Sequence, residues 1–129
     1  MSERQFLAPE DGTPWEYDEP GPEGGPVVRW RTLVSGDRTP TSGVTFGLCE
    51  VPPGAELRPH HHGPAEVYYV TAGRAEVLVD GLWTAVGPGD VVYHPGDAVH
   101  GIRNRSADPF SLVYAFPVDS FSEIRYVDD

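Results

Sequence analysis

The stretch RPHHHGPAEVYYVTAG (residues 58–73) carries the strongest signal for both fold and function. It holds three consecutive histidines, a Gly-Pro break, a glutamate and an apolar run. In an extended chain alternate side chains point to the same face, so His60 and His62 share a face and His61 points the other way. Their Cα atoms would lie about 6.6 Å apart, which lets both imidazoles reach one ion at roughly 2.1 Å. The stretch therefore indicates a pair of metal ligands, with His61 facing solvent or the outer side of a sheet.

The histidines are concentrated in one part of the sequence, because all five lie between residues 60 and 100. A barrel would bring Glu66 and His100 close to His60 and His62, since each lies on a neighbouring extended segment. Three neutral imidazole nitrogens and one carboxylate oxygen suit Fe(II), Mn(II), Co(II), Ni(II) or Zn(II), and they do not suit Ca(II). His94 precedes a proline at the end of a predicted strand, where a supporting or surface position is expected and not a fifth ligand.

Composition and charge exclude several classes of partner. The 129 residues carry a formal net charge of −11, which disfavours nucleic acid and anionic membranes. All nine basic residues are Arg, so no lysine is present for Schiff-base chemistry. The one cysteine, Cys49, cannot form an internal disulfide, and it is expected to be a buried structural thiol in a reducing compartment. No apolar stretch has the length of a membrane span and no signal pattern opens the chain, so we expect a cytoplasmic protein.

Turn residues punctuate the sequence at short intervals, with 15 Gly and 14 Pro. Strands are predicted about every eight to twelve residues, and no segment keeps a helical period over three turns. This spacing favours an all-β sandwich or barrel over residues 27–129, preceded by an irregular Pro/Gly-rich arm over residues 1–26. The predicted strands are 27–34, 44–51, 66–73, 75–81, 82–86, 91–97, 98–104 and 110–116, with 121–127 as a strand or a helical turn.

Two spaced sets of residues make the sequence resemble the cupins. The first set matches the first cupin motif at every defined position: Gly54, His60, His62, Glu66 and Gly73. The second set resembles the second cupin motif: Gly89, Pro95, His100 and Asn104. One position departs from the family, because Asp97 stands where the usual glycine follows the proline by two residues. The two motifs and the strands between them cover residues 54–104.

The resemblance implies a double-stranded β-helix, which is a jelly-roll barrel, around one divalent transition metal (Fe, Mn, Ni, Co or Zn). The ligands implied by position are His60, His62, Glu66 and His100. Small cupins also pair as dimers through outer sheets and terminal strands, so the resemblance implies a homodimer. Candidates for that contact are the arm with its aromatic Trp15 and Tyr17, and an outward-facing Trp30 or Tyr69.

A narrower resemblance concerns the reaction. The run HxHxxxExY from His60 to Tyr68, a histidine forty residues after the first, and the tail YAFPVDSFSEIRY (114–126) are similar to small cupin lyases that cleave dimethylsulfoniopropionate. This resemblance implies that the metal binds the substrate carboxylate while Tyr68 removes the proton alpha to it, so that dimethyl sulfide leaves and acrylate forms. The same residues are compatible with a lyase or decarboxylase of another small carboxylate, an Fe(II)-dependent dioxygenase, a natural-product cyclase or isomerase, and a non-catalytic small-molecule binder. A complete ligand set favours an enzyme over the binder.

Two further expectations concern side chains near the predicted ligands. Tyr68 should project on the same side as Glu66. It is either a core tyrosine or a general base or acid whose pKa, normally about 10, is lowered by a neighbouring cation. Arg58 and Arg103 are expected at the surface by default, and either can neutralise a substrate carboxylate at the mouth of the barrel.

Overall fold

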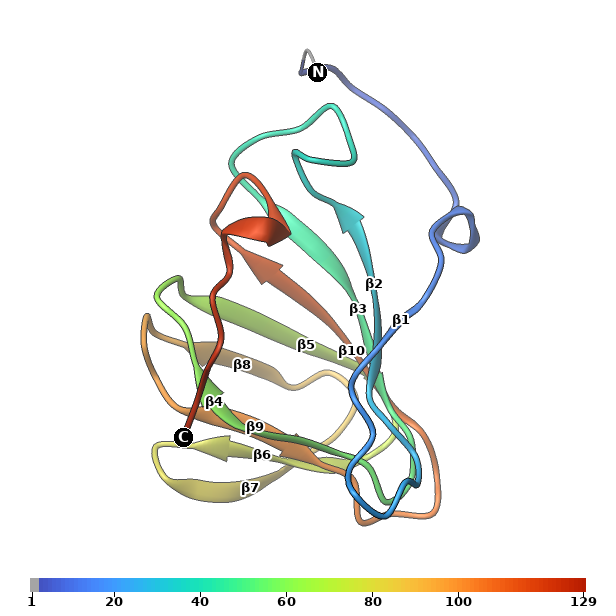
Figure 1. The fold of residues 1–129 in the computed structure, drawn as a ribbon, viewed down its shortest axis with the longest axis vertical. Coiled ribbons are helices and arrows are strands. Elements are labelled where there is room, and N and C mark those ends of the chain that lie inside the picture. Colours follow the sequence, from blue (N-terminus) through green and yellow to red (C-terminus); the bar gives the residue numbers. More distant parts are fainter. Residues whose placement is uncertain (1–2) are drawn as a thin grey trace.

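Two antiparallel sheets face each other in the computed structural model, which describes residues 3–129 (Figure 1). The larger sheet has the order β1-β2-β3-β10-β5-β8, and the smaller has the order β11-β4-β9-β6-β7. The strands are β1 (Glu16–Tyr17), β2 (Arg29–Val34), β3 (Thr45–Val51), β4 (Glu56–His61), β5 (Glu66–Ala72), β6 (Ala75–Val79), β7 (Leu82–Val86), β8 (Val91–His94), β9 (His100–Arg103), β10 (Phe110–Phe116) and β11 (Val127–Asp128). Two short 3-10 helices are η1 (Glu10–Gly12) and η2 (Phe121–Glu123). The predicted all-β, jelly-roll class is confirmed.

Alternating burial along the strands explains why the two sheets pack. In β10 every second side chain is buried, which places Phe110, Leu112 and Phe116 between the sheets. Val77 and Ile102 approach them from the smaller sheet and are fully buried. Each such side chain contributes about 1.5–3 kcal/mol when it leaves water. In residues 3–129 no helix has the length and apolar character needed to span a membrane.

Strand β4 was not among the predicted strands, although residues 60–62 were expected to be extended and β4 carries the first predicted ligand. Pro59 interrupts the strand pattern, because proline has no N–H to give to a ladder. The register with β9 shifts between Leu57 and His60, and His60 then pairs with His100. A side chain at Gly101 would meet the carbonyl oxygen of Leu57 at 2.8 Å, so glycine allows this close approach. The irregular pairing therefore brings two predicted ligands opposite each other.

The last segment contains both structures that the sequence left open. Ser120 caps η2, accepting a hydrogen bond from the Ser122 N–H (3.2 Å), while the Ser120 N–H donates to Glu123 (3.0 Å). Strand β11 follows and pairs with β4, with Val127 opposite His61 and Asp128 opposite His60. The tail thus runs alongside the strand that carries the first histidine ligand (Figure 1).

Asp97 keeps the backbone geometry that the cupin motif usually assigns to glycine. Its φ is 63°, in the left-handed region, and Asp tolerates that region better than most residues. The Asp97 N–H donates to the carbonyl of His62 (2.8 Å), so this turn supports the second histidine. The motif glycines Gly54, Gly73 and Gly89 also have positive φ.

The N-terminal arm contacts its own barrel. β1 pairs with β2 and forms the edge of the larger sheet. The Trp15 ring packs under the guanidinium groups of Arg29 and Arg31, at 4.0 and 4.3 Å from the ring centroid. Since Arg29 and Arg31 point outward to Trp15, alternation turns Trp30 to the inner face. The expectation that Trp30 faces outward is therefore wrong, because Trp30 lines an internal cavity, whereas Tyr69 is exposed as expected.

The Asp97 turn gives a test of stability. We expect Asp97→Ala to have a free energy of unfolding about 1 kcal/mol lower than Asp97→Gly, because a Cβ atom disfavours the left-handed region and glycine removes that penalty. Urea unfolding followed by tryptophan fluorescence measures both variants. Equal stability of the two variants would contradict the role assigned to this turn.

Candidate metal centre

Three buried imidazoles converge inside the barrel. His60 lies near the end of β4, His62 directly follows that strand, and His100 begins β9. One potential ligand atom from each of the three lies within 4.8 Å of the others. His61 lies outside this group, with Nδ1 3.9 Å from a carboxylate oxygen of Asp97. The alternation read from the sequence thus separates His61 from its two neighbours.

Backbone carbonyls fix the orientation of each ring. The Nδ1–H group of His60 donates to the carbonyl of Arg58 (2.7 Å). In the same way, His62 donates to the carbonyl of Pro64 (2.8 Å) and His100 to that of Ala98 (2.8 Å). A hydrogen bond at Nδ1 sets the tautomer and leaves Nε2 as the atom that can bind a metal. All three rings share this arrangement, which is the one that metal-binding histidines adopt.

Glu66, the first residue of β5, contacts two of the three histidines. Its Oε1 lies 3.2 Å from Nε2 of His62 and 3.1 Å from Nε2 of His100. Ligand atoms bound to one ion at about 2.1 Å and at right angles are themselves about 3 Å apart. The three histidines form the set of mutually close potential ligand atoms, and Glu66 contacts two of them; imidazole nitrogens with an adjacent carboxylate oxygen are donors that suit a divalent transition metal.

Burial and mutual contact set the charges of these groups in the chain alone. Burial opposes ionisation of Glu66, but hydrogen bonds from His100 and His62 outweigh it and lower the pKa of the carboxyl group. Burial also lowers the pKa of His60, which favours the neutral imidazole. For His62, burial is outweighed by the hydrogen bond and charge of Glu66, and its pKa rises. The raised pKa favours protonated His62, so a metal that binds its Nε2 would displace that proton, whereas Glu66 and His60 already favour the forms that bind a metal.

Tyr68 and His94 pack directly around these four residues. Tyr68 is buried on the same side of β5 as Glu66, and both line one cavity, as the sequence predicted for its direction. Burial and then the charge on Glu66 raise the pKa of Tyr68 well above its usual value. His94 pairs with Glu66 across the sheet, stacks on His100 at 4.2 Å between centroids, and meets the Tyr68 ring edge-on at 4.7 Å. Burial lowers the pKa of His94 to about 4, so this ring is neutral.

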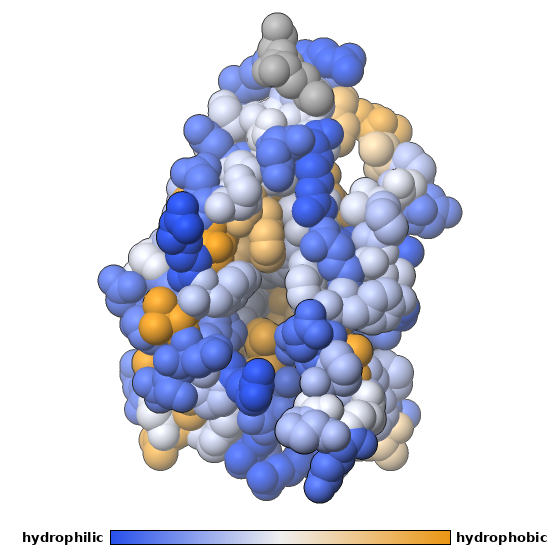
Figure 2. Space-filling view, viewed as in Figure 1, coloured by the Kyte–Doolittle hydropathy of each residue, from blue (hydrophilic) through white to orange (hydrophobic). Residues whose placement is uncertain are grey.

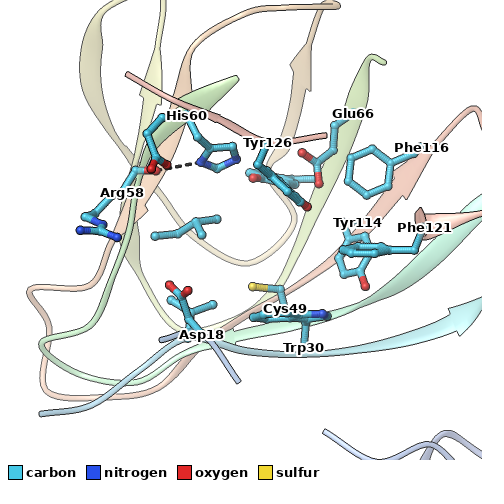
Figure 3. A pocket seen from close by; sticks show the side chains of 14 residues that line it. Asp18, Trp30, Cys49, Arg58, His60, Glu66, Tyr114, Phe116, Phe121 and Tyr126 are labelled. Carbon is cyan, nitrogen blue, oxygen red and sulfur yellow. Dashed lines mark hydrogen bonds between the residues drawn. The ribbon is translucent and has the colours of Figure 1, made fainter. Parts of the chain in front are cut away.

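A cavity of about 310 Å³ opens from the candidate metal centre to the surface. Figure 2 shows a hollow with hydrophobic residues inside it and hydrophilic residues around it. The lining residues are Asp18, Val28, Trp30, Cys49, Leu57, Arg58, His60, Glu66, Tyr68, Tyr114, Phe116, Phe121, Tyr126 and Asp128 (Figure 3). The volume is suited to one small molecule.

Terminal segments supply cavity residues that sequence reasoning did not single out. Tyr126, just before β11, lies with its ring centroid 5.2 Å from that of His60 and 5.4 Å from that of His62. Its only signal in the sequence is its place in the tail 114–126, which resembles the tail of the cupin lyases. Asp18 comes from the arm, next to β1. Both depend on how the termini cross the barrel, which no local pattern encodes.

The two arginines and the cysteine have different environments. Arg58 lines the cavity, whereas Arg103 bonds Glu76 (2.9 Å) and stacks on Trp83 (4.3 Å to the ring centroid), away from the cavity. Arg103 is therefore excluded as a cavity cation. Cys49 is buried as expected, and burial raises the pKa of its thiol.

Comparisons with known proteins agree with this geometry. The family model described as "Cupin domain" matches residues 47–116. Dimethylsulfoniopropionate lyase DddW of Ruegeria pomeroyi is 40% identical over 99 residues, which are 77% of this chain and 64% of DddW. Dimethylsulfoniopropionate lyase DddQ of the same organism is 36% identical over 64 residues, 49% of this chain and 32% of DddQ. The chain thus matches less than two thirds of the length of each lyase.

A solved structure extends the comparison of the fold to nearly the whole chain. The polyketide cyclase RemF of Streptomyces resistomycificus has a TM-score of 0.76 at 21% identity, with 96% of this chain and 86% of RemF covered. This likeness concerns the fold alone. The matched family region contains all three converging histidines and Glu66. The chain therefore belongs to the cupin domain family.

Proposed function

We propose that this chain is a metal-dependent lyase that cleaves a small zwitterionic carboxylate such as dimethylsulfoniopropionate. The observation that carries the proposal is that Tyr68, Glu66 and His60 open into one cavity. The 40% identity to a dimethylsulfoniopropionate lyase supports the choice of substrate and reaction. The size of the cavity, about 310 Å³, supports a small substrate.

The proposal assigns metal binding to His60, His62, His100 and Glu66. A bound divalent transition metal would polarise the substrate carboxylate and stabilise the negative charge that develops beside it. The Nδ1 hydrogen bonds of the histidines hold Nε2 toward a common point, so little reorganisation is needed on binding. These donors are compatible with Fe, Mn, Co, Ni or Zn. Elemental analysis of the purified protein identifies which of these metals is bound.

Tyr68 is the proposed base. Its oxygen takes the proton from the carbon next to the carboxylate, the electron pair of that C–H bond forms the C=C bond of acrylate, and the C–S pair leaves with dimethyl sulfide. In the chain alone burial and Glu66 raise the pKa of Tyr68, so the phenol is protonated. A positive charge at the neighbouring histidines would lower the pKa of Tyr68 and favour its phenolate. Ionisation of Tyr68 would therefore depend on whether a metal is bound at the candidate metal centre.

The walls of the cavity suit the cationic end of such a substrate. Aromatic rings from Trp30, Phe121 and Tyr126 line it. A sulfonium or ammonium group is attracted to the faces of such rings, by about 0.5–2 kcal/mol for each good contact. If the substrate carboxylate is held near the histidines, the cationic group at the other end of the same short molecule would lie among these rings.

We further propose that the chain pairs with a second copy through the outer face of its larger sheet. Two rows of apolar side chains cross four neighbouring strands of this sheet in register: Tyr93, Val67, Ala115 and Phe46 in one, and Val91, Tyr69, Val113 and Leu48 in the other. Neither row contains a charged residue. Four strands about 4.8 Å apart make a face roughly 15 Å wide, on the scale of the apolar patches that mark interfaces.

A second copy is the partner that fits this face. Two chains with a net charge of −11 repel each other over most approaches, and an uncharged face is where that repulsion is weakest. Tyr93 and Val91 are 62% and 65% exposed on β8, which is an edge strand of the sheet. A two-fold axis at this edge would cover both rows and the unpaired β8 backbone with their own symmetry copies.

The metal proposal predicts different effects for two adjacent histidines. We expect His60→Ala to lose most of its bound metal, because it removes one of three imidazole ligands, whereas His61→Ala keeps the parent stoichiometry. Each protein is loaded with Ni(II), desalted and analysed by mass spectrometry of the metal. Retention of a full equivalent by His60→Ala would contradict the ligand assignment.

The elimination predicts a matched pair of tyrosine variants. Tyr68→Phe should lower the rate of dimethyl sulfide release by about 100-fold or more with unchanged metal content, because a general base contributes about that factor. Tyr69→Phe, whose side chain faces outward, should keep the parent rate. Gas chromatography of dimethyl sulfide measures both, with and without O₂. Full activity of Tyr68→Phe would exclude the proposed base, and a strict need for O₂ would point to a dioxygenase.

The dimer proposal predicts a mass that one outward substitution reduces. We expect the parent protein to sediment at twice 14.1 kDa, and Tyr69→Glu at 14.1 kDa, because it places a charge in the middle of the apolar face. Leu82→Glu, an equally drastic change on the exposed β7 of the other sheet, should stay dimeric. Sedimentation equilibrium at micromolar concentration measures the mass. A monomeric parent, or a dimeric Tyr69→Glu, would contradict this interface.

A further inference from the structure

Asp18 is a carboxylate that the N-terminal arm places at the cavity. β1 pairs with β2, and the Asp18 N–H continues this ribbon by donating to the carbonyl of Val28 (2.9 Å). Alternation along the extended chain points Tyr17 outward, where it is exposed, and turns Asp18 toward the cavity that Val28 and Trp30 also line. The position of Asp18 is therefore set by backbone pairing.

The carboxylate of Asp18 lies in the same cavity lining as Arg58 but forms no ion pair with it. No ion pair involves Asp18 among residues 3–129, and one of its oxygens accepts a hydrogen bond from the N–H of Glu19 (2.9 Å). The side chain is half-buried, and a carboxylate partly removed from water is stabilised by a positive partner. Such a partner can come from a molecule in the cavity.

Different chemical groups lie on opposite sides of the cavity. Figure 3 shows Asp18, Cys49 and Trp30 on the side opposite His60 and Glu66. Asp18 and Cys49 belong to the same cavity lining, and burial raises the pKa of the Cys49 thiol, so this thiol is uncharged. The histidines and Glu66 therefore lie on one side of the cavity and the carboxylate of Asp18 lies on the other, while Arg58 and Asp128 also belong to the lining.

We propose that Asp18 determines substrate specificity. Its carboxylate faces the positively charged end of the substrate, so the site prefers a zwitterion to a carboxylate of the same shape whose other end is uncharged. This inference rests on the proposed function, in which the substrate carboxylate lies at the histidines. Asp18 then adds a charge contact to the aromatic wall formed by Trp30, and it also sets the orientation of the substrate. The arm thereby becomes part of the binding site.

The test compares the binding of two ligands of equal shape. Dimethylsulfoniopropionate is the zwitterion, and 4-methylpentanoate replaces its sulfonium sulfur by a C–H group. Calorimetric titration of Ni(II)-loaded protein in a Tyr68→Phe background gives both dissociation constants without turnover. We expect Asp18→Asn to weaken binding of the zwitterion about fivefold, the size of one well-placed ion pair, and to leave the binding of 4-methylpentanoate unchanged.

Two variants separate a local charge contact from a change in net charge. Glu19→Gln removes the same charge from the neighbouring exposed residue, and it should keep the preference for the zwitterion. Asp18→Glu retains the carboxylate and should keep the preference as well. An equal loss of both ligands in Asp18→Asn, an unchanged preference, or a parent protein without any preference would each overturn the inference.

The outcome is independent of the lyase reaction. If the protein with Tyr68 releases no dimethyl sulfide but Asp18→Asn abolishes the preference for the zwitterion, the role of Asp18 stands and the proposed reaction fails. If the protein releases dimethyl sulfide and Asp18→Asn retains the full preference, the reaction stands and the role of Asp18 fails.

Discussion

Three hydrogen bonds from imidazole Nδ1 atoms to backbone carbonyls fix the geometry on which the candidate metal centre depends. They determine which nitrogen of each ring faces the centre, and they do so through backbone whose position is set by strand pairing. The ladder between β4 and β9 places His60 opposite His100, and the turn at Asp97 holds the carbonyl of His62. The pairing of the strands thus places the three imidazole rings close together, and the rings themselves supply the nitrogen atoms that can bind a metal.

The short distances between Glu66, the histidines and Tyr68 mean that the charge of each group affects the ionisation of the others. The negative charge of Glu66 favours a protonated His62 and disfavours ionisation of Tyr68 when no cation is present. A divalent ion at the histidines would reverse the sign of the local field, so under the proposed function the ionisation of Tyr68 would depend on binding of the ion. His94 stays neutral because it is buried, and it fills the space between His100 and Tyr68 without adding charge.

Sequence patterns predicted much of the fold and the convergence of the histidines. Alternation places His60 with His62 and Glu66 with Tyr68, whereas His100 was expected from its match to the second cupin motif. Strand β4 was missed because Pro59 masks a strand that survives through a shifted register. Trp30 faces the cavity, while Arg29 and Arg31 on either side of it stack on Trp15 from the N-terminal arm. Such contacts join residues distant in sequence, and local periodicity does not contain them.

Residues 125–129 are held to the barrel by the two-residue strand β11 and one further backbone hydrogen bond, from the Asp129 N–H to the Pro59 carbonyl (3.3 Å). This exposed segment follows Ile124, the last residue that packs in the core, and it provides Tyr126 and Asp128 to the cavity wall. The sheets carry the histidines, while two residues that would touch the rest of a bound molecule lie on a segment that adds no side chain to the core. Substitutions in residues 125–129 can therefore alter which molecules are accepted at small cost to folding, so ligand preference can evolve separately from the barrel.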